Sequence, residues 1–121
     1  MGGAYACNVP DTTLLITAVR SLSDRLRTLP ESALRRGAAA EGLALARELA
    51  LRAQRLEFPG RVPRELPDAG LFAVGDQLAV AGHDLAEILR GVDDGGEKLT
   101  SAVDLVEAGA RRVADAVART R

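Results

Sequence analysis

The sequence predicts an all-α protein, an up-down-up-down four-helix bundle made of two helical hairpins. Three stretches of the 121-residue chain carry apolar residues at alternating spacings of four and three, and a fourth carries them at spacings of four and seven. Both patterns place the apolar residues on one face of a helix. Apolar residues make up 47% of the chain and aromatic residues only 2%, so the core must consist of Leu, Val and Ala. All-β folds draw on aromatic and β-branched side chains, which are scarce here apart from Val.

The first helix is expected to begin at Asp11 or Thr12, because either side chain can cap a helix start, and to end before Pro30. The apolar positions of its stripe are Leu15, Val19, Leu22, Leu26 and Leu29. Residues 1–10 contain two glycines and a proline, and they are expected to form an N-terminal tail.

The second helix is expected to run from Pro30 to about Leu56, because proline suits a first helical turn. Its apolar face comprises Leu34, Ala38, Leu45, Leu49 and Leu56. Gly37 and Gly42 each cost about 1 kcal/mol relative to alanine in a helix. That cost is tolerable if the glycines let a neighbouring helix come close.

A Pro-rich linker at 57–67 separates the two pairs of helices. Its three prolines and one glycine are incompatible with a continuous helix or a sheet ladder. We expect residues 11–121 to form a single four-helix bundle domain that contains this linker.

The third helix is expected to start near Asp68 and carries the strongest periodic signal, in Leu71, Val74, Leu78, Ala81, Leu85, Ile88 and Val92. Gly75 and Gly82 lie seven residues apart on one flank of this stripe, where they allow close approach of another helix. Residues 93–96, two Asp followed by two Gly, predict a turn. The fourth helix repeats the pattern in Leu99, Val103, Val106, Ala110, Val113 and Val117.

The predicted lengths leave one end of the bundle open. The first helix has room for roughly 18 residues and the second for roughly 27, so the first falls short by roughly 13 Å. In an up-down-up-down bundle, the missing piece lies beside the end of the second helix, where the third begins and the fourth ends. The residues predicted to border this gap, including all three aromatic residues of the chain, are Tyr5, Leu56, Phe58, Leu71, Phe72, Val113 and Val117. Either Tyr5 folds back and plugs the gap, or the gap is an apolar binding site.

No catalytic apparatus, metal site or cofactor site is predicted. His83 is the only histidine and falls on the outward face of the third helix, where with Glu87 it supplies two metal ligands and no third. Cys7 is the only cysteine and lies in the tail, away from any base that could activate it. The glycines lack the Gly-Lys-Ser/Thr sequence of a phosphate-binding loop. Carboxylates such as Asp76 and Asp84 are expected on helix surfaces.

The charge pattern does not favour nucleic acid as a partner. The net charge is −1, with ten arginines against seven acidic residues in 1–67 and six basic against ten acidic residues in 68–121. The two halves can complement each other within one chain or between two copies, or they form solvated helix faces. The arginines are not interleaved with aromatic residues, as single-stranded nucleic acid would require.

No apolar run approaches the roughly 18 residues that span a membrane, and the N-terminus lacks the apolar stretch of a signal peptide. A cytoplasmic location is therefore expected. The second hairpin resembles in outline the small helical-hairpin secretion substrates of actinobacteria, but it lacks their Trp-x-Gly turn and C-terminal Tyr-x-x-x-Asp/Glu signal. We therefore assign no family.

The function expected from these observations is that of a non-catalytic helical interaction protein. It would bind a protein partner, or a second copy of itself as a homodimer, through the apolar end of the bundle. The alternative is a small-molecule-binding bundle that uses the same gap as a pocket for a small apolar ligand.

Overall fold

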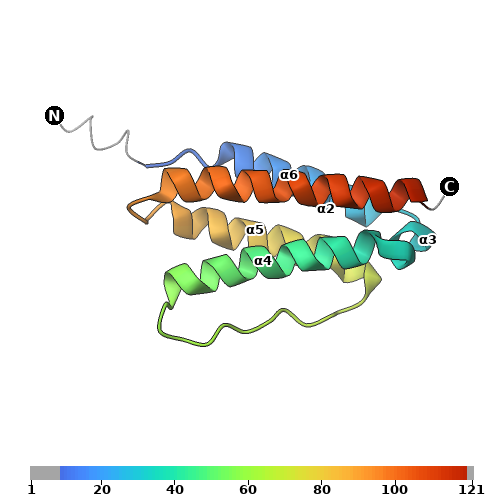
Figure 1. The fold of residues 1–121 in the computed structure, drawn as a ribbon, viewed down its shortest axis with the longest axis horizontal. Helices are drawn as coiled ribbons and strands as arrows, with labels where there is room; N and C mark the ends of the chain where they lie inside the picture. Colours follow the sequence, from blue (N-terminus) through green and yellow to red (C-terminus); the bar gives the residue numbers. More distant parts are fainter. Residues whose placement is uncertain (1–8, 120–121) are drawn as a thin grey trace.

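The computed structural model describes residues 9–119 and confirms an all-α bundle of four long helices, with no strand in that range (Figure 1). The long helices are α2 (Thr13–Thr28), α4 (Ala39–Glu57), α5 (Val74–Leu89) and α6 (Gly95–Arg119). Three short elements accompany them: α3 (Glu31–Ala33), the π-helical turn η1 (Leu34–Ala38) and the 3-10 turn η2 (Leu71–Ala73).

Helix α2 begins close to the predicted position. The carboxylate of Asp11 accepts a hydrogen bond from the backbone N–H of Thr13 at 2.9 Å. Hydrogen bonding with Thr13, of its side chain first and its backbone second, lowers the pKa of Asp11 below its ordinary value. The helix ends at Thr28, just before Leu29 and Pro30, because the residue before a proline disfavours the helical conformation.

The predicted second helix is interrupted near its beginning. Gly37 has a φ of 146°, a conformation that side-chain-bearing residues rarely adopt, and the chain kinks there between α3 and α4. The kink places Leu34 and Ala38 in the core at the end of the bundle. Sequence reasoning treated Gly37 as a tolerated helical residue, whereas the structure uses its conformational freedom.

The predicted third helix is shorter than expected at both ends. Asp68 does not cap it, because its carboxylate instead accepts a hydrogen bond from the N–H of Gly70 at 2.9 Å and forms a local turn. The regular helix starts only at Val74 and ends at Leu89. Conversely, Gly95, which was expected in a turn, is the first residue of α6.

The helix directions differ from the predicted up-down-up-down order, because α4 and α5 run the same way (Figure 1). Gly42, near the start of α4, lies against Val74 at the start of α5. At the other end of the same two helices, Leu56 and Leu89 line one cleft. Helices α2 and α6 run in the opposite direction, which gives an up-down-down-up bundle.

The reason is the segment 58–70, which we call the strap and which turns at 58–61 before it extends. It runs back along the length of the bundle beside α4 and α5 (Figure 1). An extended, proline-rich chain covers about 3.1 Å per residue, so residues 62–70 reach about 28 Å, roughly the length of a 19-residue helix such as α4. A connection of this length allows α5 to start at the same end of the bundle as α4.

Side-chain hydrogen bonds fix the strap to the helices beneath it. The side-chain amide of Gln54 donates to the carbonyl of Arg64 and accepts from its N–H, both at 2.8 Å. Arg47 Nε donates to the Leu66 carbonyl at 2.8 Å, and Gln77 Nε2 donates to the carbonyl of Pro67 at 2.9 Å. The side chain of Leu66 packs against the core.

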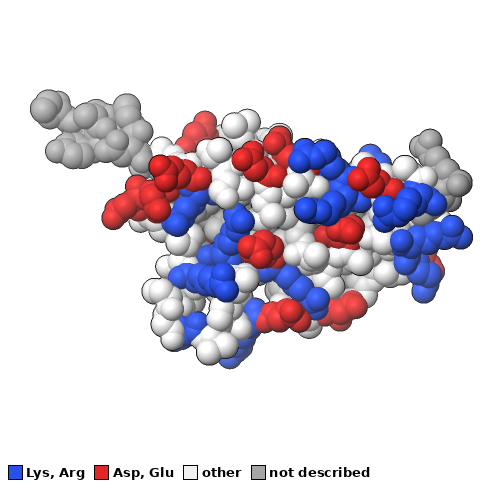
Figure 2. Space-filling model, viewed as in Figure 1, with Lys and Arg blue, Asp and Glu red and all other residues white. Residues whose placement is uncertain are grey.

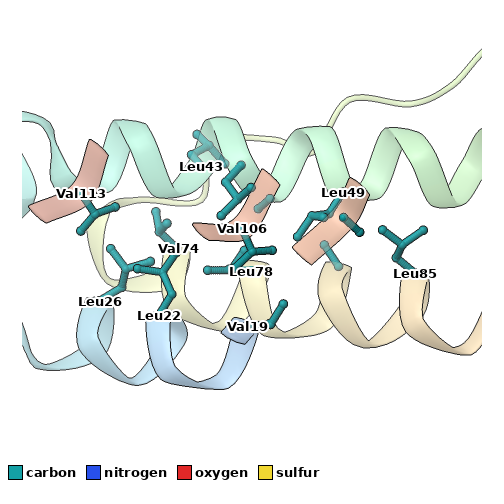
Figure 3. Close-up of a cluster of buried hydrophobic side chains, with 14 of the residues drawn as sticks. Val19, Leu22, Leu26, Leu43, Leu49, Val74, Leu78, Leu85, Val106 and Val113 are labelled. Atoms are coloured by element: carbon teal, nitrogen blue, oxygen red, sulfur yellow. The ribbon is translucent and has the colours of Figure 1, made fainter. Parts of the chain in front are cut away.

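The core contains the predicted stripes and spans all four long helices. Val19 of α2, Leu49 of α4, Leu78 of α5 and Val106 of α6 point toward one another (Figure 3). Burial of each such Leu or Val contributes roughly 1.5–3 kcal/mol to folding. Leu, Val and Ala are the apolar residues that fill this buried cluster, as the composition predicted.

Gly75 and Gly82 lie where α5 meets α2, as predicted from their spacing. A Cβ on Gly82 would come within 2.6 Å of a methyl of Val19, and one on Gly75 within 2.9 Å of the backbone oxygen of Ser23. Ser23 is 0% exposed, and its hydroxyl has no hydrogen-bond partner within the described chain. The small side chain of Ser23 therefore serves to let α5 come close to α2. Helices α2 and α5 therefore approach each other closely at these two glycines.

We expect Gly82→Ala to destabilise the protein by about 1–2 kcal/mol, because overpacking against Val19 outweighs the gain in helix propensity. Gly96→Ala is the matched control: nothing lies within 4 Å of its Cβ position, so it should be neutral or stabilising by up to about 1 kcal/mol. Urea unfolding followed by far-UV circular dichroism measures both changes. Equal effects of the two substitutions would contradict the close packing of α2 on α5.

We expect Gln54→Ala to loosen the strap without unfolding the helices, because it removes both hydrogen bonds to Arg64. Trypsin cleavage after Arg61 and Arg64 should accelerate about tenfold, the effect of losing one to two hydrogen bonds. The control Thr17→Ala truncates an exposed residue on α2 and should leave the cleavage rate unchanged. An unaltered cleavage rate in Gln54→Ala would show that these bonds do not hold the strap.

Candidate binding cleft

The residues predicted to border one apolar end are not brought together. Leu56 and Phe58 lie at the end of α4, beside the end of α5 and the start of α6. Leu71 and Phe72 lie at the opposite end of the bundle, at the start of α5. The predicted shared gap is therefore wrong, and the cause is the parallel direction of α4 and α5.

The remaining members of the predicted set have different surroundings. Val113 is buried in the core, and Val117, in the last turn of α6, is partly buried against it at the end that also holds Phe72. Tyr5 lies outside the described residues. Phe58 is exposed, and its ring lies 4.5 Å from the guanidinium carbon of Arg61, a cation–π contact.

A cleft does exist beside Leu56, with other partners than those predicted. It has a volume of about 290 Å³ and opens between the ends of α4 and α5 and the beginning of α6. We call it the α4–α5–α6 cleft. Its lining residues are Arg52, Arg55, Leu56, Leu85, Leu89, Lys98 and Ser101.

The floor of the cleft is apolar. Leu85 and Leu89 are each 1% exposed and belong to the core, and Leu56 is partly buried against it. In its first turns, α6 contributes Lys98 and Ser101 to the cleft, whereas further along, Leu105 packs against the core. The cleft is left open because α6 has no large apolar side chain among its lining residues.

The rim carries three cations, two of which are paired. Arg52 Nε donates to a carboxylate oxygen of Glu48 at 3.1 Å, and Arg52 Nη1 donates to the hydroxyl of Ser101 at 3.1 Å. Lys98 lies 3.3 Å from a carboxylate oxygen of Asp94. Arg55 is exposed and has no ion pair within residues 9–119. Figure 2 shows Lys and Arg side chains gathered between α4 and the beginning of α6.

The described part of the chain offers little other site chemistry. Residues 9–119 hold no group of three or more His, Cys, Asp or Glu side chains that could bind a metal ion, and His83 is exposed on α5. Cys7 lies outside this range. No described helix is both long and apolar enough to cross a bilayer. No family model, curated protein or solved structure matches this chain.

The sequence predicted one residue of the apolar floor and missed the other lining residues of the cleft. Leu56 was predicted to border a gap, but Leu85, Leu89, Lys98 and Ser101 were not. The available signal was the length of the Pro-rich linker, because a segment able to span the bundle permits α5 to run parallel to α4. With that direction, the ends of α4 and α5 meet the beginning of α6.

Proposed function

We propose that this chain is a non-catalytic binding protein and that the α4–α5–α6 cleft takes a small ligand with an apolar body. The observation that carries the proposal is a concave opening with Leu56, Leu85 and Leu89 at its floor and polar groups at its rim. Small-molecule sites generally combine an apolar lining with a few converging polar groups.

The size of the cleft bounds the ligand. A water molecule takes a share of about 30 Å³ in the liquid, so the cleft holds about ten groups of that size. A ligand of about ten non-hydrogen atoms gains roughly 3–7 kcal/mol at ordinary ligand efficiency, which corresponds to a Kd between about 10 µM and several mM. The ligand is therefore small and reversibly bound.

The polar groups of the cleft support binding rather than catalysis. Ser101 supplies the one hydroxyl among the lining residues, and its hydrogen-bond partner is the guanidinium of Arg52. A guanidinium stays protonated and does not act as a base, so it does not activate this hydroxyl as a nucleophile.

Titration with neutral 1-octanol tests the cleft as a binding site. We expect saturable shifts in the methyl NMR signals of Leu85 and Leu89. Ser101→Trp should weaken binding at least tenfold, because the indole fills the cleft. Thr100→Trp is the matched control, because Thr100 is an exposed neighbour on α6 that does not line the cleft. This variant should bind 1-octanol as tightly as the unaltered chain does. Absence of saturable shifts, or normal binding by Ser101→Trp, would refute the proposal.

Association with a protein partner or a second copy is the second candidate function. It is supported by Phe72, which is 69% exposed in the turn η2 just before α5, and by Val80, which is 61% exposed on α5. Aromatic residues, Phe among them, are enriched in the cores of protein interfaces relative to the rest of the surface.

If Phe72 anchors self-association, light scattering after size exclusion should give a mass above the 12.7 kDa of one chain. Phe72→Asp should lower the mass to that of one chain. Helical content should stay unchanged, because the ring is exposed. Val62→Asp, which places the same charge on another exposed apolar residue, should leave the assembly intact. A monomer before any substitution would eliminate self-association through Phe72.

A further inference from the structure

We infer that the α4–α5–α6 cleft selects an amphiphilic monoanion, a medium-chain alkyl carboxylate or alkyl sulfate, whose headgroup lies on Arg55. This inference rests on the proposed binding function of the cleft and adds the charge and shape of the ligand. It follows from the charge balance at the rim, the donors that remain free there and the charge of the neighbouring groove.

The charge balance leaves one positive charge at the mouth. The carboxylates of Glu48 and Asp94 neutralise Arg52 and Lys98, at 3.1 and 3.3 Å. Arg55 has no such partner within the described residues, and it directly precedes Leu56 of the apolar floor. One uncompensated cation beside an apolar surface matches a ligand with one negative charge at the end of a hydrocarbon chain.

Arg52 can also donate hydrogen bonds to the headgroup while it keeps its bonds to Glu48 and Ser101. A guanidinium has five N–H donors, and Arg52 uses two of them, toward Glu48 and Ser101. Three donors therefore remain for the oxygens of a headgroup. Hydrogen bonds between charged groups are stronger than those between neutral ones, which favours a carboxylate or sulfate over an alcohol.

The neighbouring groove between α4 and α5 has the opposite charge. It is lined by the apolar residues Ala50, Ala53, Leu66 and Ile88, by Gln54 and by the carboxylates Glu57, Asp84 and Glu87. Glu87 pairs with Arg90 at 3.7 Å, whereas Glu57 and Asp84 have no ion pair within residues 9–119. Its volume is about 410 Å³, so size does not exclude the same hydrocarbon chain. The sign of the headgroup therefore decides which of the two openings a ligand prefers.

Four ligands that share one chain length test the inference: octyl sulfate, octanoate, 1-octanol and octylammonium, each titrated below micelle formation at low salt. We expect both anions to bind about fivefold more tightly than 1-octanol, as read from the methyl signals of Leu85 and Leu89. Octylammonium should instead shift the methyl signals of Ile88. Inorganic sulfate alone should shift none of these signals, because the chain provides the contact with the floor.

Arg55→Ala should lower the ratio of the affinity for the anions to the affinity for 1-octanol from about five to about one. Arg20→Ala removes the same charge from an exposed position on α2 and should change neither affinity. Added salt should weaken only the anions. Equal affinities for octyl sulfate and 1-octanol would overturn the headgroup inference and leave the proposed function standing. Failure of all four ligands to bind would overturn both.

Discussion

The shared direction of α4 and α5 decides which side chains meet at each end of this bundle. The strap allows this direction because its extended residues are long enough to return along both helices. Four hydrogen bonds from Arg47, Gln54 and Gln77 hold it there, and at about 0.5–1.5 kcal/mol each they contribute roughly 2–6 kcal/mol net. The strap thus acts as a structural element, although it contains no helix.

The composition of the core imposes a second requirement. Leu, Val and Ala fill less space than aromatic side chains, so the helices must approach closely to avoid voids. Gly75, Gly82 and Ser23 provide that approach between α5 and α2, and Gly109 provides it between α6 and α4, where a Cβ would lie 2.8 Å from a methyl of Leu45. The hydroxyl of Ser23 has no hydrogen-bond partner among residues 9–119, a cost of about 1–3 kcal/mol that the close contact offsets.

The same requirement explains the position of the cleft. Helix α6 packs closely on α4 at Gly109, but two turns earlier it contributes Ser101 and then Lys98 to the cleft. Leu56 of α4 is left only partly covered, and the cations around it remain in contact with solvent. The proposed binding of an anionic amphiphile uses both features, because its chain would cover the floor and its headgroup would balance Arg55.

The sequence by itself determined the class of the fold, the apolar stripes and the close packing at Gly75 and Gly82, because helical periodicity and residue size are local properties. It placed the boundaries of α2 well, but it missed the kink at Gly37 and the late start of α5. Only the tertiary structure decided the direction of α5, since a Pro-rich segment of this length can either turn sharply or span the bundle. That choice separated Phe58 from Phe72 and brought Leu56 together with Leu89, because residues far apart in sequence meet only where helix directions bring them to the same end.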